Sequence, residues 1–159
     1  MKFLPFILLI CCFGCHSPQT ADQIQSTQQN EITPDISKVD SIVNNFFQKY
    51  KVEGSSSAID YIFSTNTLGT DKKQLDGLKS KLDSTRNVIG TYYGYSLITR
   101  KSVSSDLILV TYLVKHNKQP IRFSFIFYKA NNNWSLFKFQ YDDEVISELE
   151  DSGKIYFIK

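Results

Sequence analysis

All three cysteines of this 159-residue chain lie close together near its start, at Cys11, Cys12 and Cys15. Closely spaced thiols can bind a metal ion, form a disulfide or carry a covalent modification. A structural metal site needs thiolates that separated loops of a folded domain hold in place. These cysteines instead end an apolar run over residues 3–13 that follows Lys2. The run is too short to span a bilayer, which takes about 20 apolar residues, and it is typical of a secretory signal peptide.

The residues that end at Cys15 resemble the bacterial lipobox, where a peptidase cuts and leaves a lipidated cysteine as the first residue of the mature chain. Cys12, Phe13, Gly14 and Cys15 stand at its four positions. The first two depart from the strict motif, and the pattern resembles the looser version of Bacteroidetes-type bacteria. The resemblance implies a signal peptide over residues 1–14 and lipid on Cys15. The alternative is a plain secretory signal that is cut nearby.

Lipid on Cys15 predicts attachment to a membrane, because two or three acyl chains make a stable anchor where one is marginal. The next residue, His16, resembles the outer-membrane sorting pattern, so we expect an outer membrane lipoprotein of the bacterial cell envelope. Residues 15–33 are rich in Ser and Gln and poor in large apolar side chains, which predicts a lipidated, disordered tether. The mature domain is expected to hold no disulfide and no metal ion.

The composition limits the domain count and the partners. Residues 34–159 are enough for a single domain. The formal charge is only +2, with 18 basic and 16 acidic residues interspersed, so no nucleic acid partner is expected. Aromatic residues make up 14% of the chain, which favours sheet-rich packing and an aromatic-lined cavity.

Apolar spacing predicts three helices in the first half of this domain. The first starts near Pro34, ends before Gly54, and places six apolar residues along one face: Ile36, Val39, Val43, Phe46, Phe47 and Tyr50. A shorter helix follows the serines at 55–57. A third, capped by Thr70, carries a narrow leucine stripe and fades near residues 87–90.

The second half changes to the alternating pattern of strands, over residues 91–100, 107–116, 121–130 and 134–142. The loops between them are too short for crossovers, so the strands are expected to form antiparallel hairpins. Gly94 predicts a bend or bulge. A short final helix starts after Asp142 and ends at Gly153, and residues 154–159 are predicted to form a last strand or a docked tail.

The phenylalanines of the last two strands predict their register. To place them on one face of the sheet, Phe127 must lie opposite Phe137, with the connecting loop centred on Asn132. The matched residues are Phe123, Phe125 and Phe127 on one strand and Phe137, Phe139 and Tyr141 on the other. The opposite face mixes polar and apolar residues, and Ile126, Tyr128 and Leu136 on it are candidates for a homodimer or partner interface.

The order of elements over about residues 35–141 resembles the nuclear transport factor two-like superfamily, also called SnoaL-like or cystatin-like. Small lipidated members are common in Bacteroidetes-type genomes, and this chain is similar to them. The resemblance implies an α+β fold in which N-terminal helices pack on a curved, cone-like four-stranded antiparallel sheet that encloses a pocket. A simpler helix-on-sheet sandwich is the alternative.

Enzymes of this superfamily place an Asp or His in the cone as a general base, where burial raises the pKa of a carboxylate. Asp60, among apolar neighbours on the second helix, is the candidate catalytic residue. The alternative is that it lies on the solvent-exposed side of that helix and has no catalytic role. His116 is expected to be an exposed turn residue. No nucleophile elbow, phosphate loop or dinucleotide motif is present, and no cofactor is predicted.

Tyr61, Tyr93 and Tyr112 are candidates to line a pocket for a small apolar ligand, since each pairs a ring with a hydroxyl; plain packing is the alternative. Arg122 lies within an apolar strand. If it points inward it is a ligand or carboxylate partner, and if outward an interface charge. The sequence thus favours a non-catalytic ligand-binding or protein-interaction domain on a membrane anchor, with an isomerase- or hydrolase-like enzyme using Asp60 as the alternative.

Overall fold

The computed structural model describes residues 36–66 and 69–154, with side chains through residue 151. The predicted signal peptide, Cys15, the tether and the expected start of the first helix lie outside the described residues, as do residues 155–159 of the expected tail. Within the described part of the chain, no helix is both long enough and apolar enough to cross a bilayer.

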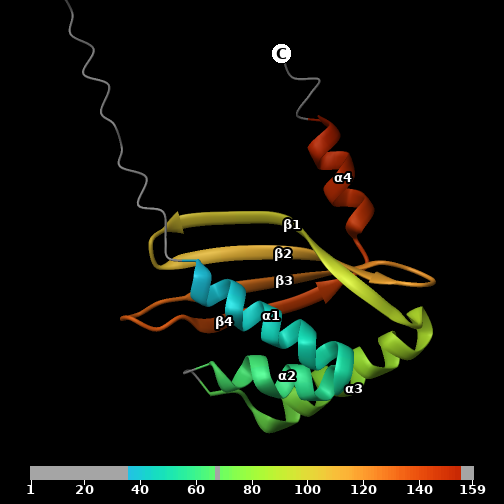
Figure 1. Ribbon diagram of the computed structural model, residues 1–159, viewed down its shortest axis with the longest axis horizontal. Helices are drawn as coiled ribbons and strands as arrows, with labels where there is room; N and C mark the ends of the chain where they lie inside the picture. The colour runs from blue at the N-terminus through green and yellow to red at the C-terminus, as the bar shows by residue number, and fades with distance from the viewer. Residues whose placement is uncertain (1–35, 67–68, 155–159) are drawn as a thin grey trace, which may run out of the picture. The chain divides into compact units, whose positions relative to one another are not determined.

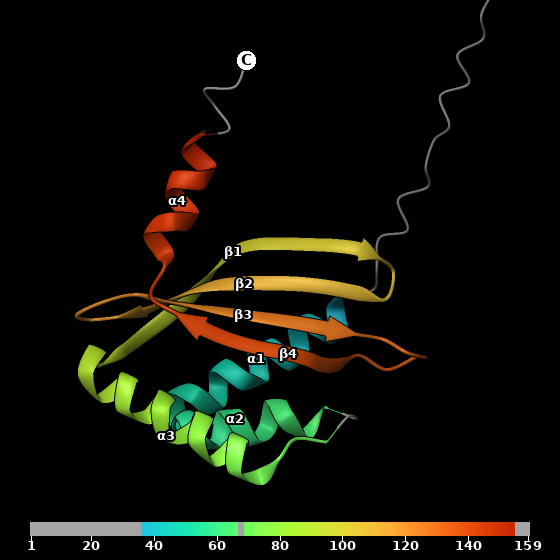
Figure 2. The ribbon, with the colours of Figure 1, turned by 180° about the vertical axis from the view of Figure 1, so that it is seen from behind.

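Four helices and one antiparallel sheet make up the described chain (Figures 1 and 2). Helices α1 (Ser37–Val52), α2 (Ser55–Ser64) and α3 (Lys72–Ile89) precede the strands and cover one face of the sheet. Strands β1 (Tyr92–Ser104), β2 (Leu107–His116), β3 (Ile121–Tyr128) and β4 (Ser135–Asp142) pair in chain order. The short α4 (Val145–Lys154) ends the fold. The predicted α+β class is confirmed, and the sheet is curled but open.

The helices follow the predicted apolar spacing. The buried side of α1 consists of Val39, Val43, Phe46, Phe47 and Tyr50, as the sequence predicts. Gly54 separates α1 from α2. The cap of α3 differs by one residue from the prediction: the carboxylate of Asp71, rather than Thr70, accepts hydrogen bonds from the backbone N–H groups of Lys73 (2.7 Å) and Gln74 (3.3 Å). A carboxylate at this position also favours the positive end of the helix.

The end of α3 is fixed to the loop between β2 and β3. Gly90 stops the helix at φ +86°, a conformation that side chains rarely adopt. Lys118 N then donates to Ile89 O (3.2 Å), and Asn117 N donates to Thr91 O (3.1 Å). These bonds hold the last turn of α3 beside the sheet, where the candidate site lies.

The curl of the sheet comes from irregular pairing of β1. Its register against β2 shifts at three places, between Tyr92 and Gly94, Leu97 and Thr99, and Ser102 and Ser104. Such bulges increase local twist and protect an edge strand from pairing with other chains. Gly94 takes φ +139° at the first shift, so the predicted bulge at this glycine is confirmed.

The predicted pairing of Phe127 with Phe137 is wrong. Phe125 does lie opposite Phe139, but the register shifts after Ile126, and Phe127 lies opposite Leu136. Phe137 is therefore the extra residue of a β-bulge and is 52% exposed, whereas Leu136 is buried. Leu136 consequently belongs to the core and not to the predicted interface patch. Of the other two residues of that patch, Ile126 is half-buried and Tyr128 is exposed.

Aromatic rings fill the space between α1 and the sheet. The Phe46 ring centroid lies 5.1 Å from that of Phe125, 5.8 Å from that of Phe139 and 5.9 Å from that of Phe123. Phe47 adds a ring stacked on Tyr95 at 3.8 Å. The region where the superfamily resemblance implies a pocket is thus packed with side chains, and the grooves lie at its margins.

Arg122 lies on the opposite face of the sheet, where α4 begins. Its guanidinium forms ion pairs with Asp142 (3.0 Å), Glu144 (3.5 Å) and Glu148 (2.8 Å). These contacts attach the base of α4 to β3 and β4, while the helix points away from α1–α3 (Figure 2). Neither reading of Arg122 fits as stated, because the side chain points away from the core and yet pairs with carboxylates of its own chain.

Candidate functional site

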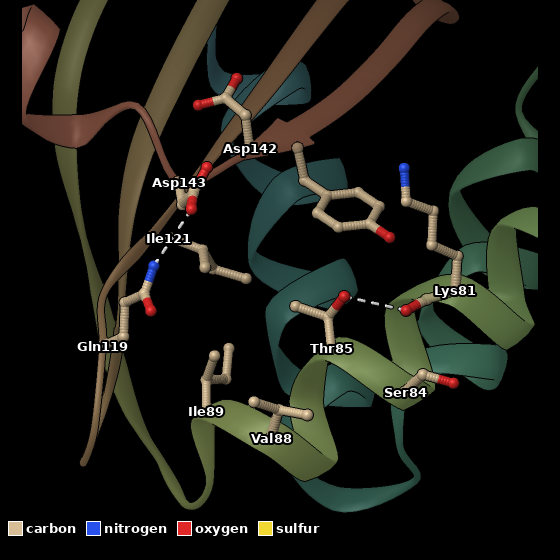
Figure 3. Close-up of a pocket in the computed structure, with 10 residues that line it drawn as sticks. Lys81, Ser84, Thr85, Val88, Ile89, Gln119, Ile121, Asp142 and Asp143 are labelled. Atoms are coloured by element: carbon tan, nitrogen blue, oxygen red, sulfur yellow. Dashed lines mark hydrogen bonds between the residues drawn. The ribbon is translucent and has the colours of Figure 1, made fainter.

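A groove of about 580 Å³ lies between the C-terminal half of α3, the start of β3 and the end of β4 (Figure 3). We call it the α3 groove. Its size is within the range of small-molecule sites. Ten residues line it: Lys81, Ser84, Thr85, Val88, Ile89, Gln119, Ile121, Tyr141, Asp142 and Asp143.

The floor of the α3 groove is apolar. Ile89 and Ile121 are buried and belong to the core, whereas Val88 is 69% exposed. Helical spacing brings Lys81, Thr85 and Val88 to the same side of α3, opposite the strand residues (Figure 3). An exposed valine beside buried isoleucines provides an apolar surface that a ligand can cover.

Tyr141 adds a polar group to this floor. Burial raises the pKa of its hydroxyl, so the group stays protonated at neutral pH. Thr85 is the polar neighbour of the Tyr141 hydroxyl, but its Oγ1 donates to the carbonyl of Lys81 (2.9 Å). The buried Tyr141 hydroxyl therefore forms no well-aligned hydrogen bond within residues 36–66 and 69–151. A buried hydroxyl without a partner is costly, and a polar atom of a ligand in the groove would satisfy it.

Charges of opposite sign border the groove. On the strand side, Asp142 is neutralised by Arg122, but Asp143 receives only a hydrogen bond from Gln119 Nε2 (3.4 Å) within the described chain. On the helix side, the Lys81 ammonium lies 5.9 Å from the centre of the Tyr141 ring. The groove therefore combines an apolar floor, an unsatisfied hydroxyl and an exposed carboxylate, which suits a small apolar molecule with a polar end.

The structure places Asp60 at the surface of α2, where it forms an ion pair with Lys79. Asp60 does not line the α3 groove. A general base of the predicted kind needs a desolvated position beside the substrate, and this carboxylate is 57% exposed. Asp60 therefore lies on the solvent-exposed side of its helix, which was the alternative to a catalytic role.

The three predicted tyrosines do not meet in one pocket. Tyr112 is buried in the core against Phe47 and Phe125. Tyr61, on α2, accepts a hydrogen bond from Asn45 Nδ2 (3.2 Å). Tyr93 is 68% exposed and lines a separate groove beside α1. None of the three lies in the α3 groove.

The expectation of an exposed His116 is wrong, because its side chain is only 7% exposed. His116 Nδ1 donates to Gly90 O (2.7 Å), and Nε2 accepts from the Tyr50 hydroxyl (3.3 Å). Burial raises the pKa of Tyr50 to about 12 and lowers that of His116, and the nearby Arg86 guanidinium lowers the His116 pKa further. The histidine connects α1, the end of α3 and β2, and we assign it a structural role.

Sequence reasoning missed the residues of the α3 groove. Lysines on an amphipathic helix and acids at the start of a helix are typical of solvated surface, so neither group indicates a site. One sequence signal could have indicated the helix side of the groove. The leucine stripe continues toward the end of the helix, since Leu82, Thr85 and Ile89 follow Leu78 at helical spacing. Which strand residues face this stripe depends on the fold.

No family model matches this sequence, and no curated protein or solved structure was found to be similar to it. The resemblance to the nuclear transport factor two-like superfamily therefore remains a prediction from the order of elements. Residues 36–66 and 69–151 also hold no group of three or more His, Cys, Asp or Glu side chains arranged to bind a metal.

Proposed function

We propose that this protein is a lipid-anchored envelope protein whose domain binds a small apolar ligand with a polar end, without catalysing a reaction. The ligand occupies the α3 groove. The observation that carries the proposal is the buried, unpartnered Tyr141 hydroxyl beside the exposed Val88 on an apolar floor. The surface position of Asp60 supports a binding role over the enzyme alternative.

The apolar ring of the ligand is expected to cover Val88 and Ile121, since burial of apolar area supplies most of the affinity of such sites. Its polar end then lies near Tyr141 or Asp143. An ammonium group on the ligand would pair with the Asp143 carboxylate, which forms no ion pair within residues 36–66 and 69–151.

Tryptamine and indole are suitable probes, because they share a ring and differ by an ammonium group. In NMR titrations of the 15N-labelled protein, we expect both to shift amide signals of α3 and β4. Val88→Ser should weaken both probes by roughly threefold or more, because it removes apolar contact area. Asp143→Asn should weaken tryptamine but leave indole unchanged, because only tryptamine carries a charge to pair with.

The matched control is Val103→Ser, which changes another exposed valine (83%) on β1 outside the groove. It should leave both titrations unchanged. Equal losses in the two valine variants, or shifts that lie outside α3, the start of β3 and the end of β4, would contradict the placement of the ligand in the α3 groove.

The anchor requires a separate test. The intact mass of the protein isolated from bacterial membranes should correspond to a chain that starts at Cys15 and carries acyl groups. Cys15→Ala should abolish the acyl mass and release the protein from membranes, because the acyl chains supply the membrane affinity. Cys11→Ala and Cys12→Ala are matched controls that should keep the lipid, since both residues are removed with the signal peptide. An unmodified wild-type chain that washes free of membranes would contradict the anchor.

A further inference from the structure

A second groove of about 640 Å³ lies between α1 and the start of β1. We call it the α1 groove, and it differs from the α3 groove in chemistry. Its lining is mainly amide, hydroxyl and ammonium groups, and none of the lining residues is acidic: Asn44, Asn45, Phe47, Gln48, Lys51, Tyr92, Tyr93, Gly94, Tyr95 and Lys115. The proposed function does not use it.

Hydrogen bonds within the fold orient two of the amides. Asn44 Oδ1 accepts from the Tyr95 hydroxyl (2.6 Å), which leaves its Nδ2 as a free donor. Asn45 Nδ2 donates to the Tyr61 hydroxyl (3.2 Å), which leaves its Oδ1 as a free acceptor. Neighbouring positions on α1 therefore offer one donor and one acceptor, together with the exposed amide of Gln48. A ligand hydroxyl needs both kinds of partner.

The β-bulge at the start of β1 exposes an aromatic ring beside these amides. Tyr93 is the residue left out of the pairing between Tyr92 and Gly94, and it is 68% exposed. Gly94, at φ +139°, allows this backbone path, and a Cβ there would come within 3.7 Å of Lys115 Cε. The ring of Tyr93 offers an apolar surface, and Tyr95 in the same groove is fixed by stacking on the buried Phe47.

Two ammonium groups border the α1 groove from different elements, Lys51 at the end of α1 and Lys115 on β2. Both lysines are exposed, and within residues 36–66 and 69–151 neither forms an ion pair. Two cations without an acidic neighbour in the lining favour an anionic ligand.

We propose that the α1 groove binds an acidic saccharide, a sugar that carries carboxylate groups. The amides of Asn44, Asn45 and Gln48 pair with the hydroxyls, the Tyr93 ring covers the apolar face of one sugar ring, and Lys51 and Lys115 pair with the carboxylates. A simple anion would leave the amides and the Tyr93 ring unused. A neutral sugar would leave both ammonium groups unpaired.

Trigalacturonate is the probe for this proposal, with maltotriose as a neutral trisaccharide and citrate as a polycarboxylate without a sugar ring. In 15N NMR titrations we expect trigalacturonate to bind with a Kd of about 1 mM or tighter, with shifts in α1 and the start of β1. Maltotriose and citrate should each bind at least roughly tenfold more weakly. Raising the salt to about 0.5 M should weaken trigalacturonate binding, because salt screens exposed charges.

Three variants test the named groups. Tyr93→Ala should weaken trigalacturonate by roughly three- to tenfold, the usual effect of losing an aromatic contact. Lys51→Gln and Lys115→Gln should each weaken it by roughly threefold. Tyr128→Ala and Lys101→Gln are matched controls at exposed positions outside the groove and should have no effect.

Several results would overturn the proposal: no shifts up to about 10 mM trigalacturonate, equal binding of maltotriose or of citrate, or equal affinity in the Tyr93 and Tyr128 variants. The variants lie at exposed positions, so loss of the fold does not explain a loss of binding. The test is independent of the α3 groove, because Val88→Ser and Asp143→Asn should leave trigalacturonate binding unchanged.

Discussion

Replacing Phe46 with alanine is expected to lower the free energy of unfolding by about 3–5 kcal/mol, the usual cost of deleting a buried aromatic ring. Phe46 is fully buried and contacts rings of α1 and of three strand phenylalanines. The surrounding rings are themselves fixed by stacking, so the cavity cannot collapse easily. Urea unfolding followed by circular dichroism measures the change. A loss this large is a substantial part of the 5–15 kcal/mol that stabilises a typical domain.

Phe137→Ala is the matched control, because it deletes the same side chain from the bulge of β4. Phe137 is 52% exposed, so we expect a change within about 0.5 kcal/mol. The pair of variants therefore tests the register of β3 and β4 as well as the core. If the two substitutions cost the same, Phe137 is buried and the bulge after Ile126 is wrong.

The free energy of unfolding is expected to fall as the pH is lowered through and below 6.5, the ordinary pKa of histidine. Burial lowers the pKa of His116 in the folded protein, so the unfolded chain takes up a proton at a higher pH than the folded chain does. The unfolded state therefore binds more protons in this window, and stability decreases with decreasing pH until the pKa of the folded state is passed. Urea unfolding at a series of pH values measures the slope.

His116→Asn should remove this slope, because asparagine does not titrate. It should also lower stability at neutral pH by about 1–3 kcal/mol for each partner left unpaired, the Gly90 carbonyl and the Tyr50 hydroxyl. His16→Asn changes the other histidine of the chain and is expected to keep the wild-type slope. A slope that persists in His116→Asn would show that other groups cause the pH dependence.

The buried position of His116 also bears on the end of α3. Its imidazole holds the carbonyl of Gly90, the residue that stops α3 immediately before β1. Ile89 of the α3 groove lies one residue earlier. Protonated His116 still donates from Nδ1 to the Gly90 carbonyl, so this bond is expected to persist at low pH. The contact that changes is the one with Tyr50, because a protonated Nε2 no longer accepts from its hydroxyl.

The sequence by itself determines the elements of this protein. The spacing of Val39, Val43, Phe46 and Tyr50 defines the buried side of α1, and alternation defines the four strands, because these periods of 3.6 and 2 are properties of the local backbone. Alternation along β2 also places His116 on the same face as Val110, Tyr112 and Val114, so its burial could have been predicted. Short polar loops were enough to predict the order of the sheet.

The tertiary structure alone decides the register of β4 and the positions of both grooves. A bulge such as that at Phe137 depends on how Leu136 and Phe139 fit beneath α1 and α2 together, and no local pattern encodes that fit. The grooves combine residues far apart in the chain, Lys81 with Asp143 and Asn44 with Lys115. In the sequence, each of these residues looks like an ordinary solvated polar position. They form a site only because the fold brings their surfaces together.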